Sequence, residues 1–260
     1  SLLVNVTHPG NYTGAGNALG ASSDFQSVLA GRHYLAPGSP HRDAGTEVMD
    51  NRLRAELAEL TTEAPALWTA PITTETVWEP WVERDSDLPN RGYHYPPLDF
   101  LVSGLPVEGV ALALAEGVAV DVYGSAGFLL QGPAQLTGAG SPSRLNRLVQ
   151  YRMVQEDTTA AHGRVQDALV RDNLATEAAT VRLRFTEMVL PGGEGAHFSG
   201  GATLGSLILN DCELSGGRLD FNLPGTWPRT VALTNNVLDR VNASLGDGQD
   251  TTLTVQARNN

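Results

Sequence analysis

LRFTEMVL (183–190), LILNDCEL (207–214), VALTNNVL (231–238) and VQARNN (255–260) align without gaps at a constant step of 24 residues. The first and third positions of each copy are apolar, and the eighth is Leu190, Leu214 and Leu238. Alternation of apolar and polar residues is typical of a short strand with one buried face. A repeat of this length accommodates a strand, a polar corner and a second strand, as one turn of a β-solenoid requires. The repeat therefore predicts stacked coils of 24 residues in a parallel β-helix.

The fifth and sixth positions of each copy fit the corner between two strands. They are Glu187/Met188, Asp211/Cys212, Asn235/Asn236 and Asn259/Asn260. Asn and Asp tolerate left-handed backbone angles, and stacked Asn side chains can form hydrogen-bonded ladders. The columns predict structural roles for Asp211 and Cys212. No His lies near Cys212 in the sequence to activate its thiol.

The rest of the chain divides into two regions. Residues 1–99 are predicted to hold the end of a preceding β-helix region and a linker with one short amphipathic helix, at about residues 48–60. Residues 100–260 are predicted to form a β-helix domain, with irregular first coils in 101–156 and a loop or short helix between 157 and 177. The fourth copy stops at Asn260, within a corner, so we expect a domain truncated at its C-terminal end, cut from a longer protein.

The composition favours short strands over a helical bundle. Charged residues make up only 18% of the 260, while 28 Gly and 15 Pro indicate frequent turns. The net charge of −12 disfavours nucleic acid and anionic membranes as partners. The single cysteine cannot form an internal disulfide, and no apolar run is long enough to predict a membrane span.

Two segments resemble a known family. HYLAPGSPHRDAGT (33–46) resembles a segment that recurs at the end of right-handed parallel β-helix domains in large bacterial extracellular proteins. DLPNRGYHYPP (87–97) resembles the segment that usually follows it. The resemblance implies an all-β, right-handed parallel β-helix of the pectate-lyase-like superfamily in a secreted or cell-surface protein. It does not imply a particular activity.

The search for catalytic residues gives one candidate group. Enzymes that act on acidic polysaccharides need clustered carboxylates, or a calcium site with a basic residue that abstracts a proton. Arg182 and Arg184 are predicted to face outward on one strand beside Asp211 of the next coil, where they could serve as the base of a lyase. Exposed Arg on a strand is ordinary, so a surface pair is the alternative. The hydrolase pattern of the superfamily ends in Arg-x-Lys, and this chain contains no Lys.

Candidate ligand-binding residues are aromatic: Trp68, Trp78, Trp81, Tyr93 and Tyr95. If they are exposed, their rings would stack on sugars, and if they are buried, they would pack the linker onto the solenoid.

Two Asp-rich turns are candidate calcium sites, and no cofactor other than calcium is expected. One combines Asp85 and Asp87 with Asn90, and the other contains Asp247 and Asp250. The alternative is that both are ordinary turns. The six His residues lack the spacing of a zinc site.

These features predict a non-catalytic structural or binding segment of a large secreted or cell-surface β-helix protein. We expect a monomer that contacts glycans or acts like an adhesin, with a polysaccharide or cell-surface ligand as partner. The alternative is a carbohydrate-active enzyme, either a polysaccharide lyase or a glycoside hydrolase. Its groove would bring together carboxylates and Arg residues from adjacent coils.

If Asp247 and Asp250 bind calcium, the melting temperature should rise in calcium and fall back in chelator. The reason is that a ligand of the folded state alone stabilises that state. Thermal unfolding followed by circular dichroism, with magnesium as the control ion, measures this effect. An unchanged melting curve in calcium contradicts the assignment.

Overall fold

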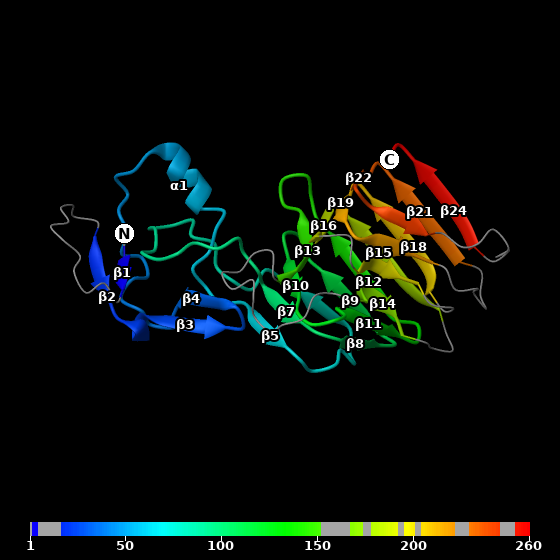
Figure 1. Cartoon of the computed structure of the whole chain (residues 1–260), viewed down its shortest axis with the longest axis horizontal. Helices are drawn as coiled ribbons and strands as arrows, with labels where there is room; N and C mark the ends of the chain where they lie inside the picture. Colours follow the sequence, from blue (N-terminus) through cyan, green and yellow to red (C-terminus); the bar gives the residue numbers. More distant parts are fainter. Residues whose placement is uncertain are drawn as a thin grey trace. The chain divides into compact units, whose positions relative to one another are not determined.

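The computed structural model describes residues 2–4, 17–151, 167–173, 178–191, 195–200, 204–221, 229–244 and 253–260. Asp247 and Asp250 lie outside these residues. The chain forms two compact units (Figure 1). The N-terminal unit comprises Ser1–Pro65, Val82–Leu98 and Val154–Ala160. The solenoid unit comprises Ala66–Trp81, Asp99–Met153 and Ala161–Asn260.

Three parallel sheets make up the described part of the solenoid unit. In spatial order, the first contains β22 (Val237–Asp239), β19 (Glu213–Gly216), β16 (Thr186–Leu190), β13 (Asn146–Gln150), β10 (Ala119–Val122), β7 (Phe100–Val102) and β5 (Ala66–Trp68). The second contains β23 (Asn242–Ser244), β20 (Arg218–Asp220), β17 (Ala196–Ser199), β14 (Ala168–Asp172), β11 (Phe128–Gln131) and β8 (Leu105–Glu108). The third contains β24 (Leu253–Arg258), β21 (Arg229–Thr234), β18 (Leu204–Asn210), β15 (Ala179–Arg184), β12 (Gln135–Ala139), β9 (Ala111–Leu114) and β6 (Thr76–Trp78).

This arrangement confirms the predicted all-β parallel β-helix, because neighbouring strands of each sheet come from consecutive coils. Leu207 pairs with Val231, and Val231 pairs with Val255, so the step of 24 residues holds across the last three coils. Each strand satisfies its backbone groups through the coils before and after it. The expectation of a loop or short helix was wrong for the described residues 167–173, where β14 forms. A strand as short as this one gives little periodic signal in the sequence.

The alignment of the first repeat copy was wrong by two residues. Leu183 pairs with Leu209, and it is Val181 that pairs with Leu207. Side chains alternate across a strand with a period of two, so a shift of two residues keeps the same apolar face and the sequence does not reveal it. The corner of this coil therefore begins at Phe185, and Glu187 and Met188 lie in β16.

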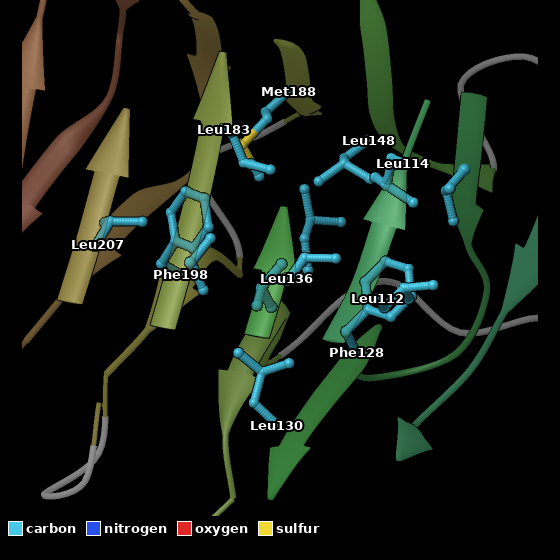
Figure 2. Close-up of a cluster of buried hydrophobic side chains, with 14 of the residues drawn as sticks. Leu112, Leu114, Phe128, Leu130, Leu136, Leu148, Leu183, Met188, Phe198 and Leu207 are labelled. Atoms are coloured by element: carbon cyan, nitrogen blue, oxygen red, sulfur yellow. The ribbon is translucent and has the colours of Figure 1, made fainter. Parts of the chain in front are cut away.

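Inward side chains form apolar columns between the sheets (Figure 2). One column consists of Phe100, Val120, Leu148, Met188 and Leu214, and another consists of Leu112, Leu136, Val181, Leu207 and Val231. None of these side chains is more than 4% exposed. Burying one Leu or Phe completely contributes about 1.5–3 kcal/mol, so the columns supply most of the driving force for stacking.

An inner ladder of side chains links the corners between the third and first sheets. The Oδ1 atom of Asn260 accepts a hydrogen bond from the backbone N–H of Asn236 at 2.9 Å. In the same way, the Oδ1 atom of Asn236 accepts a hydrogen bond from the backbone N–H of Cys212 at 2.9 Å. The thiol of Cys212 donates to the carbonyl oxygen of Leu183 at 3.5 Å, as Nδ2 of Asn236 donates to that of Leu209 at 3.1 Å. The predicted stack position of Cys212 is confirmed, and its thiol takes the place of an amide group in the ladder.

An outer ladder runs beside the inner one. Asn259 donates through Nδ2 to Oδ1 of Asn235 at 3.0 Å, and Asn235 donates to Oδ1 of Asp211 at 3.2 Å. Asp211, Asn235 and Asn259 have φ angles of 54°, 56° and 53°, which lie in the left-handed region that Asn and Asp adopt most readily among residues with a side chain. Their predicted corner role is confirmed. In the preceding coil Phe185 occupies this position, with φ of 46°.

The N-terminal unit contains shorter elements. They are β1 (Leu2–Val4) paired in parallel with β2 (Ala18–Gly20), a 3-10 helix (Ser22–Asp24), β3 (Phe25–Val28) paired antiparallel with β4 (Gly31–Leu35), and α1 (Asn51–Leu57). The predicted helix is thus confirmed over a shorter range. The carboxylate of Asp50 caps α1 by accepting the backbone N–H of Arg52 at 2.9 Å. No residue of α1 is fully buried; Leu53 is exposed and Leu57 is half-buried, so the expected apolar face packs only in part.

Replacing Asn236 with Ala should lower the free energy of unfolding by about 2–4 kcal/mol. The change leaves the buried N–H of Cys212 and the carbonyl of Leu209 without their partner, and each such loss costs about 1–3 kcal/mol. Urea denaturation measures the difference. Gln256→Ala on exposed β24 is the control and should change stability by less than about 0.5 kcal/mol. Equal effects of the two substitutions would show that the ladder contributes nothing.

Candidate functional site

The most unusual titratable group is Asp121 on β10. Its neighbours Val120 and Val122 belong to the core, so alternation along the strand directs Asp121 toward the opposite face of the sheet. It is nevertheless 0% exposed, and neither carboxylate oxygen has a hydrogen-bond partner among the described residues. Burial raises the pKa of this carboxyl well above its usual range, and the nearby backbone N–H of Val122 and the charge of Arg147 oppose the rise.

An ion pair lies next to Asp121 on the same face. Ala119, Arg147 and Glu187 follow one another in register across β10, β13 and β16. The Nε atom of Arg147 donates to Oε2 of Glu187 at 2.7 Å. Arg147 is therefore engaged with Glu187 and makes no hydrogen bond to Asp121. Two carboxyl groups and one Arg from three consecutive coils therefore lie on the same face of this sheet.

Asp99 has a structural role that the sequence analysis did not identify. It is 0% exposed, and its two carboxylate oxygens accept the backbone N–H groups of Trp81 and Ala119, each at 2.8 Å. The carboxylate thus ties the segment after β6 to the start of β10. Sequence reasoning missed Asp121 as well. Its only sequence signal is a single carboxyl group within the apolar run VAVDVY (118–123).

The predicted group of Arg182, Arg184 and Asp211 forms a surface pair. Nε of Arg184 donates to Oδ2 of Asp211 at 3.2 Å, and the guanidinium lies 4.7 Å from the ring centre of Phe185. The other carboxylate oxygen of Asp211 accepts from Asn235. Arg182 is exposed on the same strand. One oxygen of Asp211 thus holds the outer ladder and the other holds the ion pair. This arrangement favours the alternative interpretation, in which these residues form a surface ion pair and do not supply the base of a lyase.

The candidate calcium ligands of the N-terminal unit are engaged with protein groups. Asp85 is 4% exposed, accepts the backbone N–H of Asn90 at 2.9 Å and pairs with Nε2 of His94. The side chain of Asn90 in turn accepts the N–H of Asp43 at 2.7 Å. Asp87 is exposed, and it shares with Asp85 a polar pocket of about 160 Å³. Among the described residues, no three His, Cys, Asp or Glu side chains form a metal-binding group.

The five candidate aromatic residues are divided between the two units. Trp78 is 3% exposed and stacks on Phe100 with ring centres 4.3 Å apart, whereas Trp68 packs beside it at 5.3 Å. Trp81 is 66% exposed. These three belong to the solenoid unit, while Tyr93 and Tyr95 belong to the N-terminal unit. Trp78 therefore belongs to the core of the solenoid, and only Trp81 and Tyr93 have widely exposed rings.

Two further buried groups are held in their neutral forms. Burial raises the pKa of the Cys212 thiol to about 11, so this thiol is a poor nucleophile at neutral pH. Burial lowers the pKa of His197 to about 4, against the opposing effect of its hydrogen bond to the carbonyl of Gly216 at 2.8 Å. Both side chains pack in the solenoid and form hydrogen bonds with backbone carbonyl groups.

Comparison of the chain with protein-family models, with curated proteins and with solved structures gave no match. Within the described ranges, no helix has the length and apolar character needed to cross a membrane.

Replacing Asp121 with Asn should raise the free energy of unfolding at neutral pH by about 1 kcal/mol or more. A carboxyl whose folded pKa is raised keeps its proton to a higher pH in the folded protein than in the unfolded chain, which ionises above a pH of about 4. Stability is therefore lost as pH rises from that value toward the folded pKa, and the advantage of Asn should shrink as pH falls back to about 4. Urea denaturation across this pH range measures both effects.

Asp239→Asn is the matched control, because the side chain of Asp239 is 52% exposed and pairs with Arg240. It should change stability by less than about 0.5 kcal/mol at each pH. A stability gain in Asp121→Asn that does not depend on pH would exclude a raised pKa as its cause.

Proposed function

We propose that the chain is a non-catalytic segment of a large secreted or cell-surface protein, in which the solenoid serves as a rigid spacer and the chain contacts glycans. The observation that carries this proposal is the pair of corner ladders, which fasten consecutive coils through side chains as well as through strand pairing. A spacer needs coils that do not slide past one another. The inner ladder supplies this resistance at Asn236, which is only 3% exposed, because breaking its rung leaves buried groups unsatisfied.

The charges on the described outer faces also support a structural role. Arg147 pairs with Glu187, Arg184 with Asp211, and Arg218 with Asp220. Oppositely charged residues that neutralise one another contribute little binding energy for a charged substrate. An acidic chain of net charge −12 would in addition repel an anionic polysaccharide.

The pectate-lyase-like superfamily is part of the proposal, together with a bacterial, extracellular origin. Its support is the resemblance of residues 33–46 and 87–97 to segments of such proteins. In the structure, Asn90 of the second segment accepts the N–H of Asp43 of the first, so the two segments are fastened to each other. Their joint occurrence in the sequence thus has a physical basis.

A second candidate function is carbohydrate cleavage, which Asp121 favours. Buried carboxyl groups with raised pKa values are over-represented at catalytic sites, where they act as general acids. Arg147 and Glu187 lie beside it on the same face. Against this, a carboxyl of 0% exposure has no contact with solvent through which a substrate would reach it.

Incubation of the whole chain with polygalacturonate, pectin and a neutral galactan distinguishes the two functions. We expect no unsaturated products and no new reducing ends beyond those in a boiled-protein control. Sustained product formation that disappears in the folded Asp121→Asn variant would overturn the spacer proposal and establish an enzyme. Product formation unchanged in that variant would place catalysis elsewhere in the chain and would also reject the spacer proposal.

A further inference from the structure

A second pocket lies in the N-terminal unit, and we call it the aromatic pocket. Its volume is about 460 Å³, and its described lining consists of Leu2, Val4, Phe25, His33, Gly92 and Tyr93. Pockets for small ligands typically have about 300–1,000 Å³. The lining comes from β1, β3 and β4 and from the segment that contains Gly92 and Tyr93. Two segments distant in sequence therefore build one concave surface.

Buried Tyr95 orients two of the lining residues. It is 1% exposed and its ring packs against Tyr34, with centres 4.4 Å apart. Its hydroxyl accepts the backbone N–H of His33 at 3.0 Å, and its ring contacts that of Tyr93 at 4.6 Å in an edge arrangement. The ring of His33 is held further by Phe25, at 5.5 Å and nearly perpendicular. The lining residues Phe25, His33 and Tyr93 thus belong to one aromatic cluster with Tyr34 and Tyr95.

Tyr93 remains 56% exposed although it is part of this cluster. A large aromatic ring gains free energy by burial, so a ligand that covers the exposed face of Tyr93 would bind favourably. Preorganisation of such a ring lowers the entropy that binding would otherwise lose. The geometry therefore provides a flat stacking platform at the pocket wall.

The chemistry of the lining selects the class of ligand. The described lining contains no carboxylate and no guanidinium group, and its polar groups are the imidazole of His33 and the phenol of Tyr93. A sugar ring has an apolar face of C–H groups that stacks on an aromatic ring, and hydroxyl groups that bond to imidazole and phenol. The net charge of −12 disfavours an acidic sugar.

We propose that the aromatic pocket binds a neutral saccharide, whose ring stacks on Tyr93 while its hydroxyl groups bond to His33. This inference rests on the glycan-contacting part of the proposed function and supplies its site. The spacer role of the solenoid does not depend on saccharide binding by this pocket. That role is tested separately, by the incubation with polysaccharides in which no cleavage products are expected.

Titration of the whole chain with cellotriose, maltotriose, xylotriose and trigalacturonate tests the proposal. We expect at least one neutral trisaccharide to bind with a Kd of about 1 mM, measured by calorimetry and by saturation-transfer NMR, and to shift the ring resonances of Tyr93. Tyr93→Ala should weaken this binding by about tenfold or more, whereas Tyr93→Phe, which keeps the platform, should stay within about threefold.

Trp81→Ala is the matched control, because Trp81 is 66% exposed and lies in the solenoid unit, outside the pocket. It should leave the affinity unchanged. Tyr95→Phe removes the hydroxyl that positions His33 while keeping the ring, and should weaken binding by about threefold. Tyr95 is thus a positioning residue, and circular dichroism verifies that each variant folds.

Three outcomes would overturn the proposal, each with wild-type protein or a folded variant. The first is no binding of any neutral trisaccharide at about 10 mM, well above the expected Kd. The second is equal affinity of Tyr93→Ala and wild type, or no shift of the Tyr93 resonances in wild type. The third is tighter binding of trigalacturonate than of every neutral sugar, which would indicate a site for acidic glycans.

Discussion

Strand pairing between consecutive coils is the constraint on which the solenoid depends. Every strand of the three sheets takes its hydrogen-bond partners from the coil before or after it, so a coil contributes its full stability only when all its strands are in register together. Pairing alone specifies this register weakly, because apolar columns look alike after a shift of two residues. The corner ladders add the missing specificity, since an Asn side chain reaches its partner only at one offset.

The same pairing explains which parts of the fold could be predicted from the sequence. Alternation of apolar residues and a regular column of Asn identify strands and corners, and both appear where the chain repeats without insertion, as from Leu207 to Val255. The coil before Leu207 is longer by two residues, and the alternation gave no warning of this difference. β14 escaped notice because it is a single short strand outside the repeat.

The candidate site was less predictable, because burial and pairing depend on contacts between distant residues. Asp211 and Asp85 have the sequence context of ligands, yet each is engaged by neighbours in space. Asp121 has the context of an ordinary strand residue, and only the closed surroundings of its carboxyl make it unusual. Tyr93 and Tyr95 were both among the candidate aromatic residues, but the sequence did not show which of the two rings is buried.

In the last coils, the ladder corner is shorter than the corner between the second and third sheets. Phe185 alone joins β15 to β16, and two residues join β18 to β19 and β21 to β22. By contrast, residues 200–203 separate β17 from β18, and residues 221–228 separate β20 from β21. Long connections cost little additional entropy when their ends are held in place. The short corner thus keeps these coils aligned, leaving the corner between the second and third sheets free to accept insertions and diversify during evolution.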